Sequence, residues 1–228
     1  MSFKRTVIAA GSCVLFSCAS LASQAPDLSE GTWRAVNPSD ALTTIAGREP
    51  PLLPEARLKY EQNKAAARAG DRQFDTASRC LPPGMPRLLY MPGAFEFLQR
   101  REQIVILYQW NRLVRVVDMN VPQRELVGPS YLGQSVGRWE GSTLRIETIG
   151  LVDSTILDST GLPHSEQLRL TEQYIPESAN RMHVIITIDD PKMYASAWQA
   201  KLTLEHQPDG VIPEDVCLER ASPRAVNW

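Results

Sequence analysis

Apolar and polar residues alternate along most of the second half of this chain of 228 residues. In the stretch 181–188, Met182, Val184, Ile186 and Ile188 occupy every second position, which is typical of a strand with one buried face. Short runs separated by turn signals predict strands at 94–99, 103–109, 113–119, 143–149, 167–175, 181–188 and 197–206, with a further short strand at 133–139, and several of them show this alternation. The short turns between them favour antiparallel hairpins.

The first part of the chain has a different pattern. Residues 26–49 show no regular period, and the prolines at 50, 51 and 54 precede a helical run at 55–69 that Gly70 ends. The stretch 80–87 contains three prolines, which exclude a regular strand or helix and indicate a connector. We therefore expect an irregular arm and one helix from this part of the chain, next to the strands of the second half.

Seven or eight half-apolar strands after one helix predict a mainly β fold, a single antiparallel β-barrel around one core. A two-sheet β-sandwich is the alternative. We divide the chain into a leader at 1–22, an arm, helix and Pro-rich connector at 23–93, and a barrel core at 94–228.

The leader has the pattern of an export signal. Lys4 and Arg5 precede an apolar run at 6–16, which is too short to remain as a membrane span. Cleavage after Ala22 predicts plain secretion. Alternatively, the sequence Leu-Phe-Ser before Cys18 resembles a lipobox, so that the signal would end before a lipidated Cys18. Both interpretations predict a periplasmic or secreted protein, which is membrane-anchored only in the second case.

Export changes the meaning of the cysteines. Two of the four lie in the leader, which leaves Cys80 and Cys217 in the mature chain. In an oxidising compartment an even number favours a disulfide, here joining the start and the end of the core region. Two unpaired buried thiols are the alternative.

Composition narrows the function classes. The chain is 43% hydrophobic and 22% charged, as in ordinary globular proteins, and its net charge of −2 with no basic run gives no support for a nucleic-acid partner. Its three histidines lack zinc-site spacing, so we expect neither a metal nor a cofactor. The oligomeric state is left open.

Glu172 is the most informative single residue. Counting by two places its carboxylate beside Tyr174 on the apolar face of its strand, where an unpaired charge is costly. It is either a ligand-facing or acid–base group inside the barrel, or one half of an ion pair with Arg115 or Arg138.

His164 lies in the loop Gly-Leu-Pro-His-Ser-Glu that leads into the strand of Glu172. Strand entrances line the mouth of a barrel, and the near-neutral pKa of histidine suits proton transfer. A catalytic hypothesis follows, in which His164 and Glu172 transfer protons and Arg138 holds an anionic oxygen. The alternative role of His164 is to brace its loop.

The stretch 130–150 is dense in glycine and aromatic residues. Its Gly133-x-Ser135-x-Gly fits a nucleophile elbow, but a turn and a strand follow where the elbow needs a helix, so we assign no nucleophile. The next residues, Arg-Trp-Glu, either lock a hairpin or place Arg138 or Trp139 at a cavity wall. We expect Trp139, Tyr108, Arg115 and Tyr174 to contact a bound ligand.

These motifs together resemble a group of exported bacterial proteins without a settled activity. The resemblance is carried by the Gly-x-Ser-x-Gly-Arg-Trp-Glu-Gly-x-Thr-Leu of 133–144, the Gly-Leu-Pro-His-Ser-Glu of 161–166, the connector 80–87, Asp190-Pro191 and Cys217. Such proteins often have His where this chain has Gln134. By analogy the barrel is lipocalin-like, which implies apolar ligands or lyase and isomerase steps on them.

Three functions therefore remain. The first is an exported barrel that binds a small hydrophobic or aromatic molecule. The second is a cofactor-independent lyase, isomerase or hydrolase that uses His164 and Glu172. The third is a structural or interaction protein of the envelope. Whether the protein is an enzyme is left open, and a membrane is expected as a partner only through a lipid on Cys18.

Overall fold

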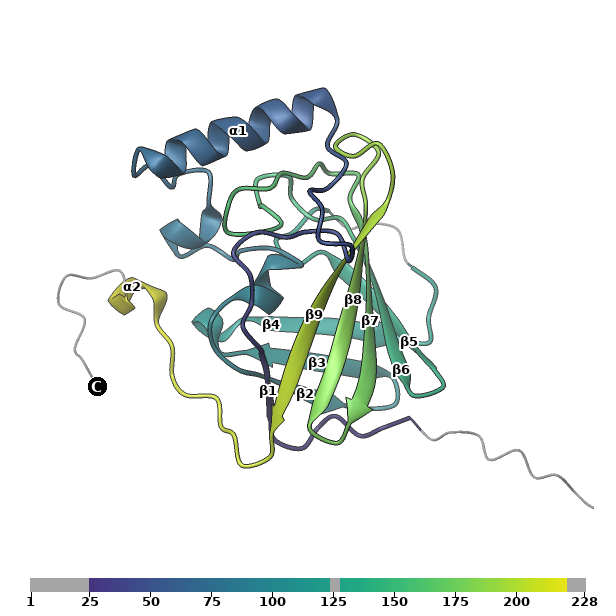
Figure 1. The fold of residues 1–228 in the computed structure, drawn as a ribbon. Coiled ribbons are helices and arrows are strands. Elements are labelled where there is room, and N and C mark those ends of the chain that lie inside the picture. The colour runs from purple at the N-terminus through teal and green to yellow at the C-terminus, as the bar shows by residue number, and fades with distance from the viewer. Residues whose placement is uncertain (1–24, 124–127, 221–228) are drawn as a thin grey trace, which may run out of the picture.

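The computed structural model describes residues 25–123 and 128–220, and within them nine strands close into a single barrel (Figure 1). The strands are β1 (Thr32–Ala35), β2 (Phe95–Gln99), β3 (Gln103–Tyr108), β4 (Val114–Met119), β5 (Gln134–Glu140), β6 (Thr143–Ile149), β7 (Arg169–Ser178), β8 (Arg181–Asp189) and β9 (Trp198–Gln207). The barrel prediction is confirmed over the sandwich. The leader, with Cys18, lies outside the described residues.

All eight predicted strands are present, and one more comes from the arm. β1 lies in the stretch without a regular period, yet it pairs with β9, as Arg34↔Glu205 shows, and with β2 at Trp33↔Phe95. The barrel thus takes its closing strand from 23–93. Four residues are too few for a period of two to be recognised in a sequence.

The sheet is antiparallel except at one place. β4 and β5 run parallel, with Val117 opposite Ser135, and residues 120–133 separate them in the sequence, more than a hairpin turn contains. All other neighbouring strands are antiparallel, as expected. The exception matters because it brings the glycine-rich stretch of β5 beside β4.

The core fills the interior of the barrel. Residues of β8 alternate strictly between buried and less buried positions, as the sequence pattern predicts. Phe97 packs edge-on against Tyr174 with ring centroids 5.7 Å apart, so strands from opposite walls meet in the middle. Within the described residues, no helix has the length and apolar character needed to cross a membrane.

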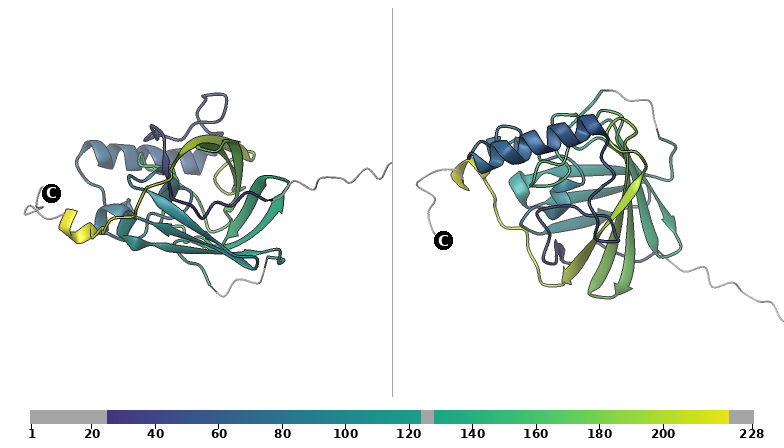
Figure 2. Two further views of the ribbon diagram at one scale, coloured as in Figure 1. Left: turned by 90° about the horizontal axis from the view of Figure 1, so that it is seen from below. Right: turned by 45° about the horizontal axis from the view of Figure 1, so that its top comes forward.

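Helix α1 (Pro54–Arg68) lies across one end of the barrel (Figures 1 and 2). Its buried residues are Ala56 and Tyr60. The Tyr60 hydroxyl lies 2.7 Å from Thr160 Oγ1, and Asn63 Nδ2 donates to the Gly161 carbonyl at 2.8 Å, so the helix is docked on the loop before β7. The N-terminal arm crosses the other end of the barrel, away from α1 (Figure 1).

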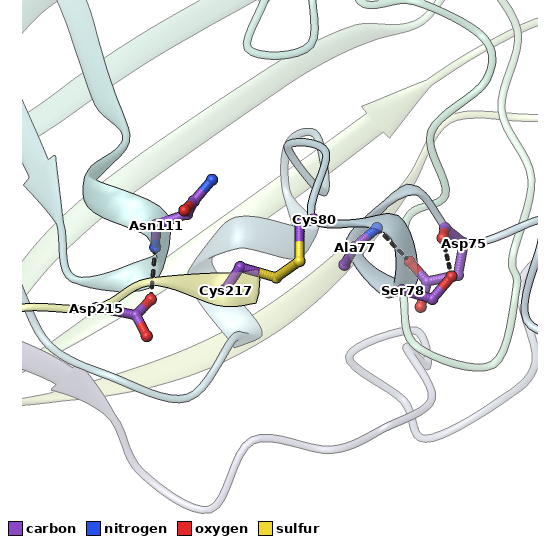
Figure 3. Close-up of a disulfide and its surroundings, with 7 residues drawn as sticks. All are labelled: Asp75, Ala77, Ser78, Cys80, Asn111, Asp215 and Cys217. Carbon is purple, nitrogen blue, oxygen red and sulfur yellow. Dashed lines mark hydrogen bonds between the residues drawn. A yellow bond between two sulfur atoms is a disulfide. The ribbon is translucent and has the colours of Figure 1, made fainter. Parts of the chain in front are cut away.

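One disulfide joins the connector to the end of the described chain (Figure 3). Cys80 follows the 3-10 turn Thr76–Arg79, and Cys217 begins the short helix α2 (Cys217–Arg220). Their Cα atoms are 5.5 Å apart. The predicted bond is confirmed. The 3-10 turns Arg87–Tyr90 and Trp110–Arg112 complete the described elements.

Candidate functional site

A buried ion pair lies inside the barrel between Glu172 of β7 and Arg115 of β4. Glu172 has no exposed surface and Arg115 is 2% exposed. Arg115 Nη1 donates to Glu172 Oε1 at 3.1 Å, and Nη2 donates to Oε2. The structure therefore selects Arg115 from the two partners that the sequence offered.

Three hydroxyl groups complete the hydrogen bonding of this pair. Arg115 Nε donates to Ser135 Oγ at 3.1 Å, its Nη2 donates to Thr148 Oγ1 at 2.8 Å, and the Tyr174 hydroxyl donates to Glu172 Oε1 at 3.0 Å. Burial opposes the charge of Arg115, but the Glu172 carboxylate outweighs it and raises the pKa of the guanidinium. Glu172 thus acts as the counter-charge of a buried cation, with its oxygens already occupied.

Tyr108 of β3 also lies near this pair. Burial raises its pKa to about 12, although the positive charge of Arg115 works in the opposite direction. Of the four predicted ligand-contacting residues, the structure brings Tyr108, Arg115 and Tyr174 together inside the barrel. Trp139 instead packs against the core at the β5–β6 hairpin, half-buried and opposite Leu144.

The Gly-x-Ser-x-Gly sequence serves this buried cluster. Gly133 has a φ of +67°, and a Cβ there would lie 2.6 Å from Thr148 Cγ2. Ser135 Oγ contacts Thr148 Oγ1 at 2.9 Å as well as Arg115, and it therefore belongs to the support of the ion pair. A Cβ on Gly137 would lie 2.8 Å from Met119 Sδ. The two glycines and the serine of the motif thus have structural roles.

His164 lies in the loop before β7 and is completely buried. Its Nδ1 lies 2.9 Å from the Ser165 carbonyl, to which it can only donate, and its Nε2 lies 2.7 Å from Thr155 Oγ1. Burial lowers the pKa of His164, with Ser165 and Asp190 acting in the opposite direction. A neutral imidazole that braces the loop accounts for this environment.

Two other motifs, Asp190-Pro191 and the connector 80–87, also contact this loop. Asp190 is 1% exposed and accepts hydrogen bonds from the Ser165 backbone N–H at 2.6 Å and from Ser165 Oγ at 2.8 Å. A Cβ on Gly84 of the connector would lie 2.6 Å from Thr155 Oγ1. Residues distant in sequence therefore pack and hydrogen-bond together here. These contacts account for the residue types of the motifs, and no catalytic role is needed to explain them.

Arg138 lies on the outside of the barrel. Its Nε donates to Glu140 Oε1 at 2.8 Å and its Nη1 to Glu147 Oε1 at 3.2 Å, on the exposed surface of the β5–β6 hairpin. Ser135 and Gly137 face inward, so Arg138 has the opposite orientation. The structure does not bring Arg138, His164 and Glu172 together, and the predicted catalytic arrangement is not formed.

A pocket of about 400 Å³ lies at the base of the barrel. Figure 1 shows the segments that line it at the end of the barrel away from α1. It lies between the arm, the β7–β8 hairpin and the end of β9. Its walls are mostly apolar and include Pro26, Leu28, Trp33, Pro176, Met182 and Pro208. Its volume and lining are those of a small-molecule site.

Trp33 and His206 lie against each other in the wall of this pocket. Their rings lie 4.7 Å apart, and His206 Nε2 donates to the Glu30 carbonyl at 2.6 Å. Trp33 is 5% exposed, and its indole N–H has no hydrogen-bond partner among the described residues. Asp27 and Glu30 add two carboxylates at the rim.

Sequence reasoning missed this pocket. Its walls come from three separate segments, around 26–33, 176–182 and 206–208, and only the closure of the barrel by β1 brings them together. The one available signal was Trp33, a large apolar residue in an otherwise polar and irregular stretch. Within the described residues, no group of three or more His, Cys, Asp or Glu could hold a metal ion.

The comparisons with known proteins return no match. No family model fits the chain, and neither a curated protein nor a solved structure is significantly similar to it. The functional argument therefore rests on the geometry of the site.

Proposed function

We propose that this protein binds a small, uncharged hydrophobic or aromatic molecule in the pocket at the base of the barrel. The observation that carries the proposal is the pocket of about 400 Å³ with an apolar floor formed by Leu28, Trp33 and Met182. All three of these side chains are buried, so the floor is part of the packed barrel. A ligand there would lie against this packed apolar floor.

The polar groups indicate what such a ligand carries. The unpaired indole N–H of Trp33 is a donor only, and a buried donor without a partner costs free energy. The N–H is covered in the free protein, so a carbonyl or ether oxygen on the ligand would satisfy it once the indole ring turns toward the pocket. The carboxylates of Asp27 and Glu30 at the rim disfavour anions.

Titration with the neutral aromatic ketone prodan tests the proposal, because its emission responds to apolar surroundings and to hydrogen bonding at its carbonyl. We expect saturable binding that Trp33→Phe weakens by about fivefold, the effect of one hydrogen bond. Trp198→Phe is the matched control, because Trp198 is also 5% exposed with an unpaired indole N–H but lines a different pocket.

Three results would overturn the proposal: no saturable binding, equal effects of the two tryptophan variants, or a larger effect of Trp198→Phe. The naphthalene sulfonate ANS serves as the anionic comparison. It should bind more weakly than prodan because of the two rim carboxylates.

We also propose that the chain is exported. Disulfides persist mainly in oxidising compartments, and the Cys80–Cys217 bond supports this location. Mass spectrometry of the mature N-terminus would distinguish cleavage after Ala22, a lipidated Cys18 and an uncleaved chain, the last of which would contradict export.

A further inference from the structure

Part of the β9 edge has no backbone partner. β1 pairs with β9 from Thr32↔Gln207 to Ala35↔Leu204, and the next residue, Val36, donates its N–H to the Thr203 carbonyl at 2.9 Å. The chain then leaves β9 and returns only where Ile45 N–H donates to the Gln199 carbonyl at 2.8 Å. Between these two bonds, no described backbone group is hydrogen-bonded to this edge.

The sequence explains why the strand stops here. Asn37 has a φ of +45°, which turns the chain out of the extended conformation. Continuing the β1 register would place Pro38 opposite Lys201, but proline has no N–H to donate to the Lys201 carbonyl. β1 therefore ends at Ala35, and the chain swings away from β9 before it returns to the start of that strand (Figure 1).

The departing loop is fixed at a distance from the edge. Ser159 N–H donates to the Asp40 carbonyl at 3.1 Å, and Leu42 N–H donates to Asp158 Oδ2 at 2.8 Å. Asp158 is 2% exposed and also accepts from the N–H groups of Thr160 and Leu162, so it is a rigid anchor. The gap beside β9 is thus built into the fold.

The open edge presents a regular array of hydrogen-bonding groups. In an antiparallel ladder, both backbone groups of a residue point to the same side and alternate along the strand. The carbonyls of Thr203 and Gln199 point toward the gap, so the N–H and C=O of Lys201 point there too. The four-residue step from Gln199 to Thr203 spans about 13 Å, enough for about three extended residues.

A pocket of about 280 Å³ occupies this gap, between the segment 36–47 and residues 200–203 of β9. Its inner wall includes Leu42, Ala200, Leu202 and Tyr90. The Tyr90 hydroxyl is buried and has no hydrogen-bond partner among the described residues. The pocket thus combines open backbone groups with an apolar inner wall.

We propose that this pocket binds a short extended peptide segment, which adds to β9 in the place that Pro38 vacates. The peptide exchanges two backbone hydrogen bonds with Lys201, as in β-strand addition. The loop 37–44 encloses the pocket opposite β9, so a linear segment fits between them whereas the edge of a second folded copy does not.

The register sets the side-chain preference. A peptide residue opposite Lys201 points its side chain outward, and its neighbours point inward, opposite Leu202 and Ala200. Ala200 lines the pocket and carries only a methyl group, so the peptide residue facing it can have a larger apolar side chain. If the peptide runs in the direction of β1, antiparallel to β9, one of its residues pairs with Lys201. The next residue of the peptide then faces Ala200.

The test is a nitrogen-15 NMR titration of the full chain with acetyl-Ala-Ala-Leu-amide. We expect the largest shifts at the amides of Gln199, Lys201 and Thr203, with saturation in the millimolar range. The matched peptide carries an N-methyl group on its second alanine, which removes the N–H that donates to Lys201. It should bind at least about fivefold more weakly.

Two variants separate this site from general stickiness. Ala200→Leu enlarges the side chain that the peptide faces and should weaken binding about tenfold, whereas Glu205→Gln changes an outward side chain of β9 that does not line this pocket and should leave the affinity within about twofold. If Ala200→Leu does not fold, comparing the affinities of the unmodified and the N-methylated peptide for the wild-type chain still tests the proposal. Equal affinity for both peptides, or no shifts at 199–203 up to about 10 mM, would overturn the proposal.

Discussion

Replacing Glu172 by Gln would leave the Arg115 guanidinium inside the barrel without a counter-charge. Breaking a buried pair in this way costs about 3–5 kcal/mol, and we expect a loss of this size in urea unfolding. The double variant Arg115→Met/Glu172→Leu should lower the free energy of unfolding by clearly less than the sum of the losses in Arg115→Met and Glu172→Leu. In the double variant the hydroxyls of Ser135 and Thr148 lie 2.9 Å apart and can bond each other, and only the Tyr174 hydroxyl loses its acceptor.

Arg138→Gln is the control for this experiment. Arg138 also contacts two carboxylates, but on the exposed surface, where solvent screens the interaction. Its effect on unfolding should be several-fold smaller than that of Glu172→Gln. Equal effects would mean that the interior pair is as well solvated as the exterior one.

The buried His164 predicts a dependence of stability on pH. Burial lowers its pKa in the folded protein, whereas in the unfolded chain it titrates near 6.5. The unfolded state therefore binds more protons below about pH 6.5, and stability is lost as the pH falls from there toward the folded pKa. His164→Gln should reduce this slope by at most about 1.4 kcal/mol per pH unit.

Thermal melts from pH 7 to 5 measure this effect, with His183→Gln as the control. His183 is half-buried and its Nε2 lies 3.2 Å from Glu177, so it is not desolvated as His164 is. An unchanged slope in His164→Gln would show that other groups cause the acid sensitivity.

Single residues show what the sequence could and could not reveal. A period of two placed Glu172 inside the barrel, because one strand suffices for that count. Choosing Arg115 over Arg138 required knowing which face of 133–139 is inward. In the structure Ser135 and Gly137 are buried, so the face that they share points inward. Arg138 lies on the opposite, outer face. The catalytic hypothesis combined residues from both faces of the sheet.

At the scale of elements, regular strands were predictable and exceptions were not. Turn signals, together with alternation in several strands, located eight strands, whereas β1 is too short to alternate and depends on its partners β9 and β2. The parallel pairing of β4 with β5 was also missed, since a long connection does not by itself indicate strand direction. Both exceptions are set by contacts between distant residues.

The parallel contact explains the glycine at 137 and makes a prediction. A methyl group there would lie 2.8 Å from both Met119 Sδ and Val117 Cγ1 of β4. Gly137→Ala should therefore destabilise the barrel by about 1–3 kcal/mol through overpacking. Val136→Ala, on the outward side of the same strand, should have a smaller effect in the same urea unfolding experiment. A neutral Gly137→Ala would show that β4 and β5 can move apart.

At the scale of the whole molecule, local patterns predicted the barrel but not where a ligand binds. The base pocket exists because the arm crosses the end of the barrel, where Leu28 N–H donates to Gln99 Oε1 at 3.2 Å. The gap beside β9 exists because one proline ends a strand. Such spaces arise where regular structure stops, and a periodic signal says nothing about those points.

The disulfide offers a test of how the whole molecule is divided. Its ends are separated by 137 residues, and removing a bond of this kind typically costs 2–5 kcal/mol. Cys80→Ser/Cys217→Ser should therefore lower the free energy of urea unfolding by about this amount. No residue lining the base pocket belongs to 75–87 or 211–220, so the folded double variant should still bind prodan as the wild type does. Loss of prodan binding under conditions where circular dichroism shows a folded barrel would mean that the bond also shapes the pocket, and that the connector and the base of the barrel form one mechanical unit.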